Sequence, residues 1–159
     1  MITGCDKTNN GTQATEGDFT NILTEEEISG KRLTPEILFK FGRVDDINLS
    51  PDGRTVIYTV RRYDAKTDKS HAWIFSVNSS GNSIPVNLTE GFPPCSNPRW
   101  VGNNSIAFIS KDGEKNKIWI MNADGSDKKV ISEADSDING FGFAGSGSRL
   151  FYLMDVKLD

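Results

Sequence analysis

One histidine, His71, stands in the whole sequence, and imidazole is the side chain that most often transfers protons in enzymes. A hydrolytic triad would need His71 beside a nucleophile and a carboxylate, but no Gly-x-Ser-x-Gly nucleophile elbow occurs in the chain. A zinc site would need several His or Cys ligands, which the sequence does not offer. We therefore predict an edge-strand histidine, and no catalytic residue, metal site or cofactor in this chain.

A glycine-rich stretch, Gly140-Phe141-Gly142-Phe143-Ala144-Gly145, fits the GxGxxG pattern of dinucleotide-binding loops. That pattern binds a pyrophosphate only where a strand runs into the N-terminus of a helix, because free N–H groups gather there. Here the next apolar stretch, Arg149–Leu153, has the composition of another strand. The glycine-rich stretch is therefore predicted to be a strand in a sheet and not a nucleotide site.

The segment from Asn122 to Asp127 hints at a calcium-binding loop. An EF-hand loop has glycine at its sixth position and oxygen ligands at its first and twelfth. With Gly125 in sixth place, those two positions fall on Ile120 and Ile131, which cannot bind the ion. The sequence therefore predicts a hairpin turn at this point.

The two cysteines stand in different surroundings. Cys95 follows two prolines and precedes Ser96, which favours a structural thiol in an inter-blade loop. Cys5 ends the run Ile2-Thr3-Gly4-Cys5, which matches the end of a bacterial lipoprotein signal, although the charged start and apolar segment of such a signal are missing. Either the start was trimmed or the match is chance. We predict a lipidation site at Cys5, which would tether an exported protein to the bacterial cell envelope, in the periplasm or at the outer membrane.

The charge balance argues against nucleic acid as a partner. The formal net charge is -4 and the isoelectric point is near 5.1, whereas nucleic-acid binding usually needs a basic face. Arg61-Arg62 and Lys128-Lys129 are isolated basic pairs. No apolar run is long enough to cross a bilayer, so we expect membrane contact only through a lipid on Cys5.

The first 42 residues divide into a polar tether and a short helical lead-in. Residues 1–20 contain the lipobox remnant and a polar stretch with too little apolar surface to order itself. In residues 21–42, Thr24 and Glu27 fit a capping box, and Gly30 follows soon after. Thr34-Pro35-Glu36 starts a second short helix, which we expect to end at Gly42.

From residue 43 to residue 159 the sequence repeats one strand–turn–strand plan. In each copy a turn leads into the second strand. The turn is Ser50-Pro51-Asp52-Gly53 in the first copy, Val101-Gly102-Asn103-Asn104 in the second copy and Ala144-Gly145-Ser146-Gly147 in the third copy. The period of about 44 to 50 residues is the length of one four-stranded propeller blade. We predict an all-β chain of about two and a half antiparallel blades, covering residues 43–90, 96–133 and 137–159.

The predicted strands follow the alternation and the Asp-Gly turns. They are Val44–Leu49, Thr55–Arg62, Ala72–Asn78 and Pro85–Thr89 in blade one, Pro98–Val101, Ser105–Lys111, Lys117–Asn122 and Lys128–Ser132 in blade two, and Ile138–Ala144 and Arg149–Asp155 in blade three.

The second strand of each copy is apolar on both faces, whereas a sheet with one wet face alternates apolar with polar residues. Stacked blades bury both faces. Tyr58, Phe108 and Tyr152 occupy equivalent positions of this strand. We therefore expect all three aromatic side chains to be largely buried between blades.

The lead-in and blade one contain a series of motifs: Leu33-Thr34-Pro35-Glu36-Ile37-Leu38, Arg43-Val44, Leu49–Arg61, Ala72–Phe75 and Val86–Thr89. This series resembles the opening of peptidases of the prolyl oligopeptidase family. Within that family, the resemblance is strongest to the dipeptidyl-peptidase and acylaminoacyl-peptidase type. The Ser-Pro-Asp-Gly turn is shared with the Tol-system periplasmic propeller protein, whereas the short Thr-Pro-Glu helix leading into it is more specific to the peptidases.

The resemblance implies a β-propeller followed by an α/β-hydrolase domain that carries the catalytic residues. We therefore expect this chain to be inactive alone, with the remaining blades and the hydrolase domain as its partners and short peptides as the substrate of the parent enzyme. In some relatives two propeller glutamates hold the substrate's amino group; Glu25-Glu26-Glu27 is explained by helix capping, so this role is not transferred. The alternative is a non-catalytic periplasmic propeller that binds proteins or glycans.

Overall fold

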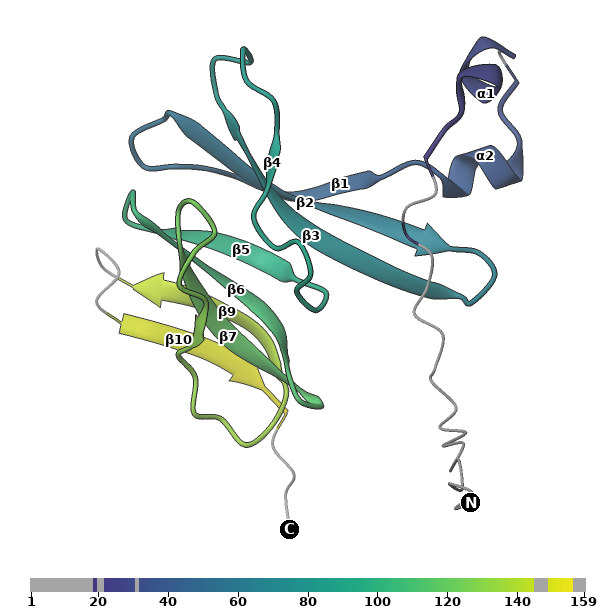
Figure 1. Cartoon of the computed structure of the whole chain (residues 1–159). Helices are drawn as coiled ribbons and strands as arrows, with labels where there is room; N and C mark the ends of the chain where they lie inside the picture. Colours follow the sequence, from purple (N-terminus) through teal and green to yellow (C-terminus); the bar gives the residue numbers. More distant parts are fainter. Residues whose placement is uncertain (1–18, 20–21, 31, 145–148, 156–159) are drawn as a thin grey trace, which may run out of the picture.

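The computed structural model describes residues 19, 22–30, 32–144 and 149–155. Two short helices, α1 (Glu25–Ser29) and α2 (Pro35–Phe39), precede the strands and lie at one end of the first sheet (Figure 1). Both begin as the sequence predicts: Thr24 and Glu27 form a complete capping box, and Thr34 caps α2 with Pro35 in its first turn. The predicted end of α2 at Gly42 is wrong, because the helix stops at Phe39 and Lys40 caps it.

Ten strands form two four-stranded sheets and one pair, all antiparallel (Figure 1). Blade one contains β1 (Arg43–Leu49), β2 (Thr55–Asp64), β3 (Lys69–Asn78) and β4 (Val86–Asn87). Blade two contains β5 (Ser96–Val101), β6 (Ser105–Asp112), β7 (Lys115–Asn122) and β8 (Lys129–Val130). Blade three is the pair β9 (Ile138–Ala144) and β10 (Arg149–Met154). This all-β plan of two and a half blades confirms the predicted fold.

The fourth strand of each complete blade is shorter than predicted, for the same reason in both. In blade one the Thr89 hydroxyl accepts a hydrogen bond from the Ile74 amide at 2.9 Å, and in blade two the Ser132 hydroxyl accepts one from the Ile118 amide at 3.0 Å. A side-chain oxygen thus replaces a backbone carbonyl and ends the regular ladder. This buried hydroxyl is a repeat feature that the alternation of apolar residues did not reveal.

The first strands of blades one and two carry matching β-bulges. The β1–β2 register shifts between Asp45 and Asn48, and the β5–β6 register shifts between Ser96 and Arg99. Each bulge contains one residue with a positive φ, 52° at both Asp46 and Asn97, which asparagine and aspartate tolerate better than most side chains. The two bulges are also joined directly, because the Asn97 amide donates to the Asp46 carboxylate at 3.1 Å.

Two apolar clusters hold the blades together, one on each side of blade two. The first joins blades one and two and consists of Ile57, Ile74, Leu88, Cys95, Ile106, Phe108 and Met121. The second joins blades two and three and consists of Ala107, Ile109, Ile118, Ala134, Ile138 and Phe141. Blade two therefore lies between its neighbours (Figure 1), and its second strand is buried on both faces as predicted.

The expectation that Tyr58, Phe108 and Tyr152 are all largely buried holds only for Phe108. Phe108 is 0% exposed, but Tyr58 is half-buried and Tyr152 is 39% exposed. Phe108 points toward blade one, whereas no described blade stands on the corresponding side of Tyr58. Tyr152 faces the cluster shared with blade two, since its register partner is Phe141, but it lies on the edge strand β10. Burial of this position therefore depends both on a covering blade and on the place of the strand in its sheet.

Candidate functional site: the open blade faces

Blade one presents a sheet face that no other described blade covers. Residues paired across β2 and β3 share a face, because directly opposed side chains of an antiparallel pair project to the same side. Ile57 and Ile74 project toward blade two. We call the opposite side the open face of blade one; its apolar residues are Val56, Tyr58, Val60, Trp73, Phe75 and Val77, all half-buried.

Aromatic contacts organise this open face. The rings of Tyr58 and Phe75, which are register partners, stack with centroids 5.9 Å apart and planes 20° apart. On the opposite side of β2, the Arg43 guanidinium lies 4.6 Å from the centre of the Tyr63 ring, a cation–π contact. Apolar side chains in contact on a half-exposed sheet form a surface suited to packing against another sheet.

Blade three has a second open face and an edge. Phe151 and Leu153 of β10 are 57% and 68% exposed and project away from the cluster shared with blade two. Their register partners are Gly142 and Gly140, so the Phe151 ring lies directly over Gly142, where an added Cβ would come within 2.4 Å of it. These glycines therefore serve strand packing, as predicted for this stretch; Gly145 lies outside the described residues.

The segment from Asn122 to Asp127 forms the predicted turn. The Gly125 amide donates to the Asn122 carbonyl at 2.9 Å, and the Ser126 amide donates to the Asp124 carboxylate at 2.9 Å. The Ser126 hydroxyl and amide lower the pKa of Asp124, because both stabilise its charged form. Within the described part of the chain, no three His, Cys, Asp or Glu side chains are grouped to hold a metal ion.

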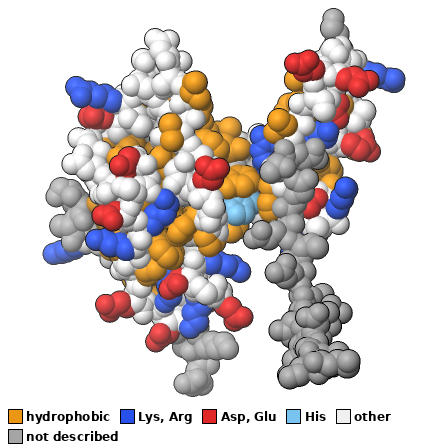
Figure 2. Space-filling view, viewed as in Figure 1, with side chains coloured by type: hydrophobic (Ala, Val, Ile, Leu, Met, Phe, Trp, Pro, Cys, Tyr) orange, Lys and Arg blue, Asp and Glu red, His pale blue; other side chains and the backbone are white. Residues whose placement is uncertain are grey.

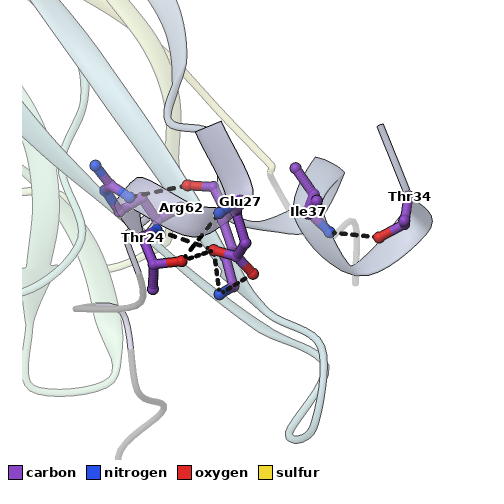
Figure 3. Close-up of polar contacts among 6 residues, drawn as sticks. Thr24, Glu27, Thr34, Ile37 and Arg62 are labelled. Atoms are coloured by element: carbon purple, nitrogen blue, oxygen red, sulfur yellow. Dashed lines mark hydrogen bonds and ion pairs between the residues drawn. The ribbon is translucent and has the colours of Figure 1, made fainter. Parts of the chain in front are cut away.

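Glu27 of the lead-in has a structural role. Glu27 closes the capping box and also forms a salt bridge of 2.7 Å with Lys40, which joins α1 to α2 (Figure 3). The Lys40 ammonium and the Thr24 amide lower the pKa of Glu27. Arg62 of β2 then donates to the Lys40 carbonyl at 3.0 Å, which attaches α2 to blade one. The sequence indicated the capping box but not these longer-range partners.

His71 lies within β3, opposite Arg62 in the register, and is half-buried. Its Nε2 is 3.1 Å from the Phe92 carbonyl oxygen, and its ring lies 4.3 Å from the Trp73 ring. In Figure 2 the pale blue His71 is surrounded by apolar side chains. The strand thus begins earlier than predicted, and the histidine belongs to an aromatic cluster.

Cys95 is buried in the first apolar cluster, and burial raises the pKa of its thiol to about 11. Such a thiol is protonated at neutral pH and inert, which fits the predicted structural role. Cys5, the predicted lipidation site, lies outside the described residues. The described helices include none that is long and apolar enough to cross a membrane.

Several solved structures of peptidases are similar to this fold. The isopeptidase AtxE2 matches with a TM-score of 0.57 at 20% identity, over 69% of this chain and 21% of that one. Acylaminoacyl peptidase of Pyrococcus horikoshii gives 0.57 at 20% identity, over 72% and 18%. The β-propeller domain of the Trilobed protease of Pyrococcus furiosus gives 0.53 at 21% identity, over 71% and 34%. At this identity the likeness shows the fold alone, which is that of a β-propeller.

Comparison with curated protein sequences shows relatives of higher sequence identity. The chain is homologous to dipeptidyl-peptidase 5: it is 30% identical to the protein of Porphyromonas endodontalis over 137 residues, and 34% identical to that of Porphyromonas gingivalis over 130 residues. These matches cover 85% and 81% of this chain, which spans about a fifth of the length of these relatives. No family model matches the sequence. The homology confirms the resemblance to the peptidases.

Proposed function

We propose that this chain is the opening part of the propeller of an exported serine exopeptidase that cleaves short peptides from their N-terminus. The observation that carries the proposal is the homology to dipeptidyl-peptidase 5, which extends over 85% of the chain. The catalytic serine would belong to an α/β-hydrolase domain in a longer protein, and this chain would contribute no reacting group.

In this proposal the propeller acts by limiting access and not by chemistry. The open faces of blades one and three would be covered by further blades, so that the closed ring admits only short peptides to the hydrolase domain. Apolar contact surfaces on both terminal blades support this arrangement, because stacked blades need buried apolar faces on both sides.

The test is to compare this chain with the product of the complete reading frame. A fluorophosphonate probe should label the longer protein at one serine, and the longer protein should release p-nitroaniline from dipeptidyl p-nitroanilides, whereas the 159-residue chain should do neither. Labelling of any serine in this chain would contradict the proposal. A longer protein with neither activity would favour the alternative, a propeller that binds proteins or glycans.

We propose in addition that Cys5 is lipidated and anchors the exported protein to a membrane of the cell envelope. The support is the run Ile2-Thr3-Gly4-Cys5 in the sequence. The longer protein expressed in its native host should partition into the detergent phase of Triton X-114, and Cys5→Ser should move it to the aqueous phase. A wild-type protein found in the aqueous phase would refute the anchor.

A further inference from the structure

An aromatic groove lies where blade one meets the linker to blade two. One wall is formed by His71 and Trp73 of β3, and the other by the linker from Gly91 to Pro94. Phe19, which precedes the helical lead-in and is far from both walls in sequence, lies in this groove. The groove therefore contains a residue that is not part of the propeller.

Phe19 makes ring contacts with both aromatic residues of the first wall. Its ring centre is 5.4 Å from that of His71 and 6.2 Å from that of Trp73, with the Trp73 contact edge-on at 77°. His71 and Trp73 are themselves 4.3 Å apart. Three rings at these separations form one cluster with favourable aromatic geometry.

The opposite wall is held in place independently of Phe19. Phe92 turns into the first apolar cluster, where its ring contacts Trp119 edge-on at 4.9 Å. The Ser110 hydroxyl donates to the Pro94 carbonyl at 3.1 Å, and the Cys95 amide donates to the Ala72 carbonyl at 2.9 Å. His71 Nε2 lies 3.1 Å from the Phe92 carbonyl oxygen, which fixes the face that the imidazole presents to Phe19. The groove is thus preformed.

The sequence singles out Phe19 as the residue that can use such a groove. It is the only aromatic residue among the first 38, and it stands in a stretch that is otherwise mostly polar. Farther along the lead-in, Glu27 and Lys40 join the two helices, and Arg62 binds the Lys40 carbonyl. The chain before β1 therefore touches blade one at two separate places, near Lys40 and at Phe19.

We propose that the groove formed by His71, Trp73 and the Gly91–Pro94 linker is the docking site of the N-terminal segment, with Phe19 as its anchor. The anchor would attach the chain to blade one at a second place, beside the junction of blades one and two. We call the described residues from Phe19 to Gly42 the strap, which is then fixed at both ends.

The experiment compares Phe19→Ala, Phe19→Tyr and Ile22→Ala in the complete chain by NMR. Trp73 is one of three tryptophans, so its indole N–H signal can be assigned and followed. Phe19→Ala should shift the Trp73 indole signal while those of Trp100 and Trp119 stay in place. Phe19→Tyr keeps the ring and should keep the shift. Ile22 is 64% exposed, and its replacement should change none of the three signals.

Trypsin cleavage at the exposed Arg32 gives a second measurement. Release of one end of the strap should make this cleavage several-fold faster in Phe19→Ala, and Ile22→Ala should leave the rate unchanged. Because Phe19 lies outside both apolar clusters, all three variants should remain folded, which urea unfolding checks. The proposal is overturned if Phe19→Ala leaves the Trp73 signal and the cleavage rate unchanged, or if Ile22→Ala has the same effects.

Discussion

Phe108 in blade two and Tyr58 in blade one stand at the same position of the same strand, yet only Phe108 is fully buried. Each residue pairs with an aromatic residue of the third strand, Phe108 with Trp119 and Tyr58 with Phe75. The two blades also share a bulged first strand and a buried hydroxyl after the fourth. The two aromatic residues differ in burial because a second sheet covers Phe108, whereas no described sheet covers Tyr58.

The comparison shows that a blade is not an independent unit of stability. Its sheet is specified locally by turns and alternation, but its apolar faces become a core only when a neighbour covers them. Blade two has both neighbours, and its second strand contains five consecutive buried residues, from Ile106 to Ser110. Blades one and three each have one described neighbour and retain an apolar surface.

The largest effect is expected from removing the two equivalent aromatics. Phe108→Ala should lower the free energy of unfolding by about 3–5 kcal/mol, because it leaves a cavity in the first apolar cluster. Tyr58→Ala should cost only about 1 kcal/mol, since its ring is already half-exposed. Urea unfolding measures both, with the exposed Lys111→Ala as a control that should stay within about 0.5 kcal/mol. Equal losses of unfolding free energy at Tyr58 and Phe108 would contradict the difference in burial between the two sheet faces.

A smaller effect concerns Cys95, which reports on the contact between blades one and two. Burial raises the pKa of this thiol from its ordinary 9.0 to about 11, so its contribution to stability is complete below pH 9 and is lost as the pH rises toward 11. In a Cys5→Ser background, alkylation of Cys95 at pH 8 should therefore require opening of the first apolar cluster, and Phe108→Ala should accelerate it. Rapid alkylation of the folded Cys5→Ser protein would contradict this cluster.

The smallest effect is expected in the lead-in. Lys40 lowers the pKa of Glu27, so the stabilisation from this pair is complete above the ordinary value of 4.5 and is lost as the pH falls through the lowered value. In an NMR titration, Lys40→Ala should move the pKa of Glu27 upward. The midpoint of urea unfolding should not change, because the pair lies outside both apolar clusters. An unmoved pKa would show that the pair does not form.

The strands and caps could be predicted because their signals are local. Thr24 and Glu27 are three residues apart, and the Asp-Gly turns set the start of each following strand, so the element bounds were mostly within a few residues. The sequence does not predict the bulge at Asn97, because Asn97-Pro98 resembles the end of a loop, and the positive φ of Asn97 is visible only in the structure.

The remaining errors involve partners that are distant in the chain. The exposure of Tyr58 depends on whether another sheet covers the open face of blade one. The contact of Phe19 with Trp73 joins residues that are separated in the sequence by the lead-in and more than half of blade one. Neither the exposure of Tyr58 nor the contact of Phe19 with Trp73 produces a periodic pattern of apolar residues in the sequence. The prediction of an edge-strand histidine misses two contacts of His71 for the same reason. Besides Trp73 of its own strand, the His71 ring contacts Phe19, and its Nε2 lies beside the Phe92 carbonyl of the linker.

The central claim is that blades one and three have apolar faces that need further sheets to cover them. Sedimentation velocity of the 159-residue chain over a range of concentrations tests this directly. The account predicts self-association, because the exposed Phe151 and Leu153 lie on a strand that is paired on only one side within the described residues. Leu153→Lys should weaken the association, whereas Lys111→Ala should not. A sharp, concentration-independent monomer that unfolds cooperatively would contradict the claim.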